Sequence, residues 1–430
     1  MKISIIGTGY VGLPTACAFA KWGHKVVCVD TDIEKISKLQ QGIPTIYENG
    51  LEKLINEVAE NLTFTTDYKD IADSDFVILA VGTPMDKDGS ANLKYLYEAA
   101  LTVDTHIKNT IIIVKSTVPV GTCADLCKYI ANNKIASMPE FLREGYALED
   151  IFNPDRIIIG TPDVNVYNII KSAYPEEYKP KIHYIRSWES SELIKYASNA
   201  FLAIKLHYIN EIANLCEKTG ANIDDVAKGM GLDSRIGPKF LKAGCGYGGS
   251  CFPKDTNAIY ALAESKGIDL SLVGAAINGN RKRQRKIAYD INKTIQMLQP
   301  AKIAVLGLAF KEGTDDIRES PAINIIKNLK NIDPTQRMVV YDPMAMENAQ
   351  KELTNIEFAN NIEECIKGAN ILIIATEWED FKNIYDKLDL MSDSNVDDVA
   401  IPMVIYDLKN ILNVNEIPSE YIYEGIGKGK

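Results

Sequence analysis

Short apolar runs that alternate with helical segments are the feature that most restricts the fold of this chain. In the first 187 residues these runs lie at Ile3–Ile6, Lys25–Val29, Phe76–Val81, Thr110–Val114 and Arg156–Gly160. They return after Pro300 at Lys302–Gly307, Met338–Tyr341, Ile371–Ala375 and Met403–Tyr406. Strands that alternate with helices form parallel sheets covered by helices on both faces. We therefore predict an α/β protein with two doubly wound domains.

The region between the two alternating parts has no strand pattern. Glu192–Glu217 contains neither glycine nor proline and predicts one long central helix, and further helical stretches follow up to Asn292. We predict three domains: residues 1–187, a helical middle region at 188–299, and residues 300–430. The basic run Arg281–Arg285 is interpreted as a solvated helix face, as runs of charge usually are.

Charge and composition exclude several classes of function. The chain has 47 Lys and Arg against 58 Asp and Glu, a net charge of −11, which disfavours nucleic acid and anionic membranes as partners. No apolar stretch approaches the length that spans a bilayer, and glycines and Pro14 interrupt the N-terminal apolar run. We therefore expect a cytoplasmic protein. Its eight cysteines form no C-x-x-C pair, and its four histidines have no ligand spacing, so we predict no metal site.

A glycine motif after the first predicted strand indicates a dinucleotide site. Gly7-x-Gly9-x-x-Gly12 allows a tight turn, a close approach of the pyrophosphate, and close packing of helix on strand. Asp30, at the end of the next predicted strand, is suited to accept hydrogen bonds from ribose hydroxyls, which favours NAD over NADP. The first domain is therefore predicted to be Rossmann-like. Polar loops at 81–84, 115–119 and 138–145 follow other strands and would face the same edge of the sheet.

The segment from Gly244 to Asp255 contains the candidate nucleophile. Pro253 fits the first position of a helix, which would put Cys251 beside the positive end of that helix, with Lys254 as its neighbour. Both features favour the reactive thiolate. A purely structural role for Cys251 stays open, because buried cysteine is common. Cys245, which lacks this placement, is expected to be inert.

A lysine and an asparagine on the long predicted helix form a second candidate pair. Lys195 and Asn199 are four residues apart and therefore share one helix face. A cation and an amide together can hold a developing oxyanion. Spacing alone leaves open that both are ordinary exposed residues of a helix.

Taken together, these motifs resemble the nucleotide-sugar dehydrogenases of the UDP-glucose/GDP-mannose dehydrogenase family along nearly the whole chain. The motifs that carry the resemblance are Gly7-Thr8-Gly9-Tyr10-Val11-Gly12, Ser116-Thr117-Val118-Pro119-Val120-Gly121, Pro139-Glu140-Phe141-Leu142-Arg143-Glu144-Gly145, Gly248-Gly249-Ser250-Cys251-Phe252-Pro253-Lys254-Asp255, Gly307-Leu308-Ala309-Phe310-Lys311 and Asp315-Asp316-Ile317-Arg318-Glu319-Ser320-Pro321. Two positions depart from the family pattern: Asn92 stands where an aspartate is usual, and Lys409 where an arginine is usual.

The resemblance implies an NAD-dependent, four-electron oxidation of UDP-glucose to UDP-glucuronate. It further implies an N-terminal NAD domain, a homodimer formed through the central helix, and a C-terminal domain that binds UDP. Cys251 would form hemithioacetal and thioester intermediates with the sugar. The other catalytic residues that it implies are Lys195, Asn199, Asp255, Glu140 and Thr117.

Further contacts are implied by the same resemblance. Those to NAD are assigned to Gly7, Gly9, Tyr10, Val11, Gly12, Asp30, Lys35, Thr83, Ser116, Thr117, Glu144, Lys254 and Arg318. Those to the substrate are assigned to Glu140, Phe141, Leu142, Arg143, Lys195, Asn199, Phe240, Leu241, Lys242, Tyr247, Gly248, Phe310 and Lys311. Arg235 is expected to reach the substrate of the neighbouring subunit.

Three alternatives remain at this stage. The substrate could be another nucleotide sugar, such as GDP-mannose or a UDP-N-acetylhexosamine. A two-electron hydroxyacid dehydrogenase can combine a similar NAD domain with a helical one, but it needs neither Cys251 nor the region after Pro300. A non-catalytic NAD-binding protein is the third alternative.

Overall fold

The structure is a computed structural model that describes residues 1–298, 301–393 and 403–429. Its chain divides into two compact units, Met1–Ser198 with Asn257–Ile268, and Asn199–Thr256 with Asp269–Lys430. We call them unit 1 and unit 2. The predicted boundary at residues 299–300 lies outside the described residues. No helix in the described part of the chain is long and apolar enough to cross a membrane.

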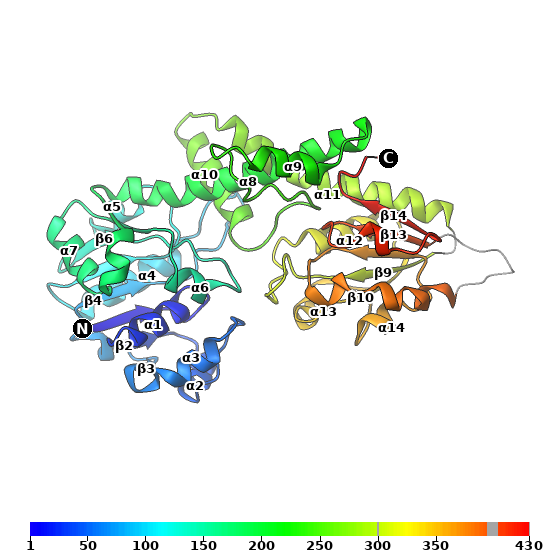
Figure 1. The fold of residues 1–430 in the computed structure, drawn as a ribbon. Coiled ribbons are helices and arrows are strands. Elements are labelled where there is room, and N and C mark those ends of the chain that lie inside the picture. Colours follow the sequence, from blue (N-terminus) through cyan, green and yellow to red (C-terminus); the bar gives the residue numbers. More distant parts are fainter. Residues whose placement is uncertain (299–300, 394–402, 430) are drawn as a thin grey trace. The chain divides into compact units, whose positions relative to one another are not determined.

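Unit 1 is built on an eight-stranded sheet in the order β3-β2-β1-β4-β5-β6-β7-β8. Figure 1 labels four of its strands, β2, β3, β4 and β6. Its strands are β1 (Lys2–Ile6), β2 (Lys25–Val29), β3 (Leu62–Thr65), β4 (Phe76–Leu79), β5 (Ile111–Val114), β6 (Lys134–Ser137), β7 (Ile157–Gly160) and β8 (Ile182–Ile185). The first six are parallel, and β7 and β8 run in the opposite direction. The sheet is therefore mixed, whereas the prediction was a fully parallel one.

Helices cover both faces of this sheet. One face packs against α1 (Gly12–Lys21), α2 (Ile33–Gln40), α3 (Leu51–Glu57) and α7 (Val164–Ser172). The other packs against α4 (Lys94–His106) and α5 (Thr122–Leu126). The short α6 (Ala147–Phe152) precedes β7. The central strands are buried on both faces, which is why they appear in the sequence as unbroken apolar runs.

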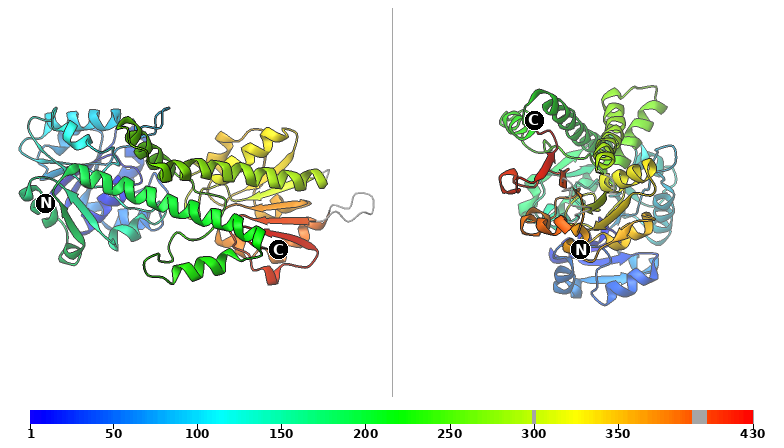
Figure 2. Two further views of the ribbon diagram at one scale, coloured as in Figure 1. Left: turned by 90° about the horizontal axis from the view of Figure 1, so that it is seen from above. Right: turned by 90° about the vertical axis from the view of Figure 1, so that its right-hand side faces the viewer.

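The middle of the chain is helical, as predicted. It contains α8 (Trp188–Thr219), α9 (Ile223–Gly231), α10 (Phe252–Ser265) and α11 (Ser271–Met297). Figure 2 shows α8 as one unbroken helix, and it extends a few residues beyond both ends of the predicted one. Two of the boundaries between the units fall within α8 and α10, and the third falls between α10 and α11.

Unit 2 contains a six-stranded parallel sheet in the order β11-β10-β9-β12-β13-β14. Its strands are β9 (Lys302–Leu306), β10 (Arg337–Tyr341), β11 (Glu357–Phe358), β12 (Ile371–Ile374), β13 (Met403–Asp407) and β14 (Tyr421–Gly425). The helices of its C-terminal part are α12 (Pro321–Ile332), α13 (Met346–Glu352), α14 (Ile362–Ile366) and α15 (Glu379–Lys382). The prediction of two doubly wound, Rossmann-like domains with a helical middle region is confirmed.

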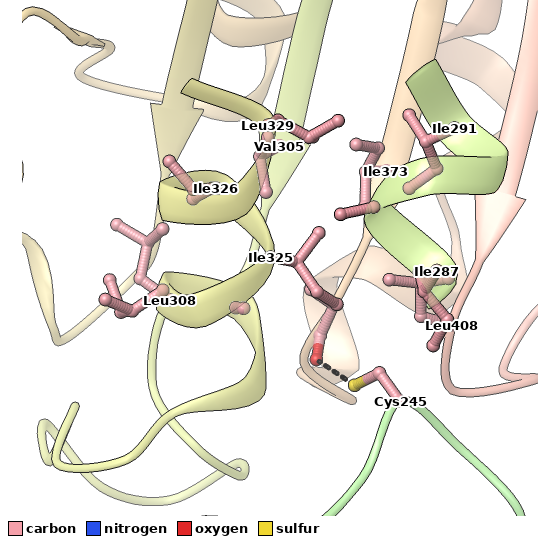
Figure 3. Packing of buried hydrophobic residues seen from close by; sticks show 14 of the residues in the cluster. Cys245, Ile287, Ile291, Val305, Leu308, Ile325, Ile326, Leu329, Ile373 and Leu408 are labelled. Atoms are coloured by element: carbon pink, nitrogen blue, oxygen red, sulfur yellow. Dashed lines mark hydrogen bonds between the residues drawn. The ribbon is translucent and has the colours of Figure 1, made fainter. Parts of the chain in front are cut away.

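The larger core of unit 2 joins this sheet to helices of the middle region. Side chains of α11 and α12 meet those of β9 and β12, and Cys245 lies among them (Figure 3). The thiol of Cys245 is 3.9 Å from the carbonyl oxygen of Ala375, and burial raises its pKa. Cys245 is therefore a buried residue of this core, and its inertness stays a prediction.

Candidate functional site

The turn between β1 and α1 has the shape that a bound dinucleotide needs. Gly7 has φ +97°, and a Cβ placed on it would lie 2.6 Å from the carbonyl oxygen of Ala80. A Cβ on Gly12 would lie 1.9 Å from the carbonyl oxygen of Gly7. A Cβ on Gly9, by contrast, would have no heavy atom within 4 Å. Gly7 and Gly12 thus allow close contact between backbone segments of the protein. Gly9 instead leaves open space in which a ligand could approach.

The start of α1 follows this turn directly and has no side-chain cap. Val11 precedes the helix. The first N–H groups of a helix have no partner within the helix, and they attract anions. Tyr10 and Val11 are half-buried on this loop. The turn therefore fits a pyrophosphate.

Asp30 lies at the end of β2, beside the same turn. Its Oδ2 accepts hydrogen bonds from the N–H and hydroxyl of Thr8 at 2.9 and 2.7 Å, and its Oδ1 accepts one from the N–H of Asp32. Burial acts to raise the pKa of Asp30, but these hydrogen bonds and the charge of Lys35 outweigh it, and the pKa is lowered. Asp30 is therefore a half-buried carboxylate that still has acceptor sites for a ribose.

Hydroxyl groups tie together the loops that follow β4 and β5. Ser116 Oγ donates to the carbonyl oxygen of Val81 at 2.7 Å, and Thr83 Oγ1 donates to that of Thr117 at 2.8 Å. Thr83 and Ser116 are buried, and Thr117 is half-buried. The structure thus gives Ser116 and Thr83 a clear task in holding these loops in place.

A buried ion pair follows β6 in unit 1. Glu140 Oε1 is 2.9 Å from Lys195 Nζ, and Glu140 Oε2 accepts a hydrogen bond from the N–H of Leu142. Lys195 Nζ also lies 5.6 Å from the centre of the Phe141 ring. The sequence motif around Glu140 and the long helix α8 are therefore joined by this pair.

The two residues that follow in this motif differ in exposure. Arg143 is exposed, and its guanidinium forms a bidentate pair with Asp150. Glu144 is half-buried. A substrate that binds Arg143 would have to compete with Asp150 for its donors.

In unit 2, Cys251 directly precedes α10. The N–H of Asp255 donates to the carbonyl oxygen of Cys251 at 2.8 Å, which is the first hydrogen bond of the helix. The helix begins at Phe252, so Pro253 occupies its second position. The prediction that Pro253 is the first residue of the helix is therefore wrong by one position. Cys251 is half-buried, and its Sγ lies 3.6 Å from Ser250 Oγ. The positive end of the α10 dipole thus lies beside this thiol.

Asp255 joins Asn199 to the segment that carries Cys251. Its side chain is 1% exposed, with Oδ2 accepting from Asn199 Nδ2 at 2.6 Å and Oδ1 from Lys254 Nζ at 2.6 Å. Lys254 therefore has a carboxylate partner, which reduces the support that its charge gives to a thiolate at Cys251. Asn199 and Lys195 lie one turn apart on α8, and both are buried rather than exposed.

The glycines before Cys251 permit close contact with another segment of unit 2. A Cβ on Gly248 would lie 2.3 Å from the carbonyl oxygen of Glu319, and one on Gly249 would lie 2.7 Å from the ring of Phe310. The N–H of Gly249 donates to the carbonyl oxygen of Arg318. The structure thus brings together two predicted motifs that are about 60 residues apart in the sequence.

The other predicted substrate and cofactor residues of unit 2 lie around this loop or at the surface. Phe240 has φ +63°, which is unusual for an aromatic residue, and its ring is 6.0 Å from that of Phe252. Leu241 and Tyr247 are buried, Lys242 is exposed and Lys311 is half-buried. Arg318 and Arg235 are exposed, and their guanidinium groups pair with Asp316 and Asp233.

Three buried polar residues that the sequence analysis did not single out hold this loop. Asn280 exchanges two 2.9 Å hydrogen bonds with the backbone of Tyr247, Asn210 accepts from the N–H of Gly244, and Arg283 donates to the carbonyl oxygen of Gly244. The interpretation of Arg281–Arg285 as a solvated face is therefore wrong for Arg283 and also for Gln284, since both are buried. The partners of Arg283 lie far away in the sequence, so no local pattern could have shown them.

No group of three or more His, Cys, Asp or Glu side chains suited to a metal ion occurs among the described residues.

Family models match the chain in three consecutive parts. They are the NAD binding domain (residues 1–177), the central domain (189–282) and the UDP binding domain (304–414) of the UDP-glucose/GDP-mannose dehydrogenase family. The chain belongs to this family. It is therefore an NAD-dependent nucleotide-sugar dehydrogenase, and the first turn of unit 1 fits the cofactor that this implies.

Individual relatives extend along the full length of this dehydrogenase. A UDP-glucose 6-dehydrogenase of Rhizobium meliloti is 44% identical, with complete coverage of both chains. The solved structure of a UDP-glucose dehydrogenase from Pyrobaculum islandicum is 34% identical, covers 99% of this chain and 97% of its own, and has a TM-score of 0.87. A UDP-D-ManNAc dehydrogenase from Pyrococcus horikoshii is 27% identical, covers 100% and 99%, and has a TM-score of 0.86.

Proposed function

We propose that this dehydrogenase oxidises UDP-glucose to UDP-glucuronate, with two NAD per sugar and a covalent intermediate on Cys251. The relative from Rhizobium meliloti, which matches along the whole chain, is a UDP-glucose 6-dehydrogenase. The fold is shared almost equally with a UDP-D-ManNAc dehydrogenase, but that protein has the lower sequence identity. The choice of sugar therefore rests on sequence identity, while the covalent chemistry rests on Cys251.

The chemistry explains why a thiol is needed. NAD, when bound, accepts the hydride that the sugar loses in each of the two oxidations. The first oxidation converts the C6 alcohol to an aldehyde and releases one proton. The thiolate of Cys251 then adds to the aldehyde carbon, and the hemithioacetal that forms again carries a hydride that can leave. Loss of that hydride gives a thioester, and water cleaves it to the carboxylate and restores the thiol.

The remaining polar residues have roles in this scheme. Lys195 and Asn199 hold the oxygen that becomes negatively charged, as such donors do in other acyl-transfer sites. Asp255, Glu140 and Thr117 position water and move protons during thioester hydrolysis. Glu140 is buried beside the ammonium group of Lys195, and its lowered pKa supports the carboxylate form. Asp255 is buried and accepts hydrogen bonds from Asn199 and Lys254.

We further propose where the cofactor binds in unit 1. The N–H groups at the start of α1 bind the pyrophosphate over Gly9, and Asp30 accepts hydrogen bonds from the ribose. Lys35, Thr83, Ser116, Thr117 and Glu144 complete this part of the site. From unit 2, Lys254 and Arg318 are also assigned to the cofactor.

The nucleotide sugar is assigned a larger set of side chains. From unit 1 these are Phe141, Leu142 and Arg143, in addition to Glu140 and Lys195. From unit 2 they are Asn199, Phe240, Leu241, Lys242, Tyr247, Gly248, Phe310 and Lys311.

The single observation that carries the covalent mechanism is the half-buried thiol at the start of α10, four residues before the buried Asp255 carboxylate. The test counts NADH per sugar and uses mass spectrometry to look for substrate bound to Cys251. Wild-type enzyme should form two NADH per UDP-glucose, and Cys251→Ser should form no acid. Cys127→Ser, at an exposed cysteine, is the control and should behave as wild type.

Each alternative predicts a different result in the same assay. One NADH per substrate, with Cys251→Ser fully active, would favour a two-electron hydroxyacid dehydrogenase. A clear preference for GDP-mannose or a UDP-N-acetylhexosamine in a panel of nucleotide sugars would reject UDP-glucose. If none of these nucleotide sugars gives NADH, the result would favour a non-catalytic NAD-binding protein.

We also propose that the enzyme is a homodimer formed through α8. Phe201, Tyr208 and Leu215 are 62%, 48% and 58% exposed, and their seven-residue spacing makes an apolar stripe along the helix. A second copy of α8 would cover such a stripe and would bring Arg235 near the partner. Phe201→Glu with Tyr208→Glu should therefore give a monomer in light scattering, whereas Tyr95→Glu, at an exposed tyrosine of α4, should not. If light scattering gives the double variant the molar mass of a dimer, this interface is contradicted.

The proposal places the enzyme in the cytoplasm. A thiol nucleophile must stay reduced, and reducing compartments keep cysteines in the free form. All eight cysteines are free in the structure.

A further inference from the structure

A second lysine lies near the Glu140–Lys195 ion pair and has no task in the reaction proposed above. Lys115 directly follows β5, Glu140 comes shortly after the neighbouring strand β6, and Lys195 belongs to α8. The three residues are 9%, 6% and 4% exposed. Two ammonium groups and one carboxylate leave this buried cluster with an excess positive charge.

The ammonium group of Lys115 differs from that of Lys195 in its contacts. Lys195 Nζ bonds Glu140 Oε1 at 2.9 Å, whereas the side chain of Lys115 makes no hydrogen bond or ion pair with any residue that the structure describes. Burial lowers the pKa of Lys115, Glu140 acts to raise it and Lys195 to lower it, and the result is a pKa of about 8. Lys115 is therefore still cationic throughout the acidic range in which carboxylates titrate.

Packing alone does not account for this lysine. A buried ammonium without a bonded partner costs folding free energy, and an apolar side chain of similar length would avoid that cost. The effect of its charge on Glu140 offers a reason for its presence. Burial acts to raise the pKa of Glu140, but Lys195, the N–H of Leu142 and the charge of Lys115 together lower it below the usual value.

We propose that Lys115 is a positioning residue that keeps Glu140 ionised, above all when Lys195 is engaged with a substrate oxygen. This inference rests on the role in thioester hydrolysis proposed for Glu140. A carboxylate can take a proton from the attacking water only if it does not already carry one. Lys195 has two tasks in that scheme, since it pairs with Glu140 and holds the oxyanion. Lys115 supplies the positive charge that stays with Glu140 throughout.

The test measures the protonation of Glu140 in the full-length enzyme without substrate. Infrared spectra recorded from acidic to neutral pH follow the C=O stretching band of the protonated Glu140 carboxyl group. This band is identified because it is absent from the spectra of Glu140→Gln. Lys115→Met removes the charge and keeps the length of the side chain, so the midpoint of this titration should rise by about one pH unit. Lys115→Arg keeps the charge and should leave the midpoint in place. Lys94→Met, at an exposed lysine of α4, is the control.

An unchanged midpoint in Lys115→Met would overturn the inference. Thermal unfolding gives a second measurement, because removing an unpartnered charge should leave the melting temperature equal or higher. A large fall in the melting temperature would assign Lys115 to packing and would also overturn it. Lys115→Gln provides a second neutral variant if Lys115→Met does not fold.

Failure of this inference can be distinguished from failure of the proposed function. The number of NADH formed per sugar is measured on the wild-type enzyme in parallel. If two NADH form per sugar but the titration midpoint of Glu140 is the same in Lys115→Met, only the role of Lys115 is rejected. One NADH per sugar would reject the four-electron reaction, whatever the infrared titration shows.

Discussion

At the scale of single residues, the turn between β1 and α1 depends on glycines, because a Cβ atom at two of its positions would collide with the backbone. Gly7 and Gly12 leave no room for a Cβ, because backbone carbonyl groups occupy that space. Gly9 has the room, and we propose that the pyrophosphate of NAD uses it. The glycine pattern therefore predicted both the turn and the ligand, since the motif encodes a local backbone shape that needs no distant residue.

Two alanine substitutions should separate the two kinds of glycine. Gly12→Ala forces a Cβ against the carbonyl oxygen of Gly7 and should lower the free energy of unfolding by about 1–3 kcal/mol. Gly9→Ala should leave stability unchanged and weaken NAD binding by about tenfold or more, because it displaces the pyrophosphate from its N–H donors. Chemical denaturation and calorimetric titration with NAD measure the two effects. A Gly9→Ala enzyme with normal NAD affinity would contradict the assignment.

The hydroxyl of Thr8 should set the ionisation of Asp30. Because the folded-state pKa of Asp30 is lowered, the carboxylate stabilises the fold above its unfolded-state pKa, and this contribution is lost as the pH falls through the folded value. Thr8→Val removes the 2.7 Å hydrogen bond to Oδ2, so the pKa of Asp30 should rise. An NMR titration of the Asp30 carboxyl carbon measures it. Thr63→Val, at an exposed position of β3, should have no such effect.

At the scale of elements, the strands that the sequence failed to predict are mostly those at sheet edges. The apolar runs predicted the well-buried strands, such as β4 and β5, but not β3, β8, β11 and β14 at the four edges, and the interior strand β6 was implied only by the polar loop at 138–145. Edge strands bury less surface, so they can carry polar residues, as the half-exposed β14 does. The reversed direction of β7 and β8 depends on pairing across the sheet, which no local pattern shows.

A side chain of α8 caps the N-terminus of α5, and this contact should be important for stability. The buried carboxylate of Glu192 accepts hydrogen bonds from the N–H groups of Gly121 and Cys123 at 2.6 and 2.8 Å. Glu192→Ala leaves both donors unsatisfied and should lower the free energy of unfolding by about 1–3 kcal/mol or more. Glu189→Ala, at an exposed glutamate of the same helix, should change it little. Equal stability of the two variants in urea would disprove this role.

At the scale of the whole molecule, the chain contains the same strand order twice. The order β3-β2-β1-β4-β5-β6 in unit 1 matches β11-β10-β9-β12-β13-β14 in unit 2, and the turn after the first strand has a glycine at φ +97° in each, Gly7 and Gly307. The sequence predicts two doubly wound domains, but the side chains of the two parts show no such correspondence. The likeness lies in backbone topology, which very different side chains can support.

The two turns differ in the acidic residue beside them, and this difference predicts how many NAD molecules one chain binds. Asp342, at the end of β10, is 1% exposed and accepts hydrogen bonds from five groups, namely the N–H groups of Leu308, Ala309, Met344 and Ala345 and the indole N–H of Trp378. A carboxylate has about four acceptor sites, so none is left for a ribose. Asp30, by contrast, is half-buried and accepts three hydrogen bonds.

Each chain should therefore bind one NAD at saturation, although the proposed reaction uses two NAD in succession for each sugar. Calorimetric titration of the wild-type enzyme with NAD measures this number, and Gly9→Ala provides the control, because it changes the proposed cofactor turn of unit 1 without a clash in the fold. We expect one site in the wild type and binding weakened about tenfold or more in Gly9→Ala. A second NAD per chain that survives in Gly9→Ala would mean that the turn after β9 binds a dinucleotide despite its occupied aspartate. In that case strand order and the turn glycine, rather than a free acidic side chain, would be sufficient for binding.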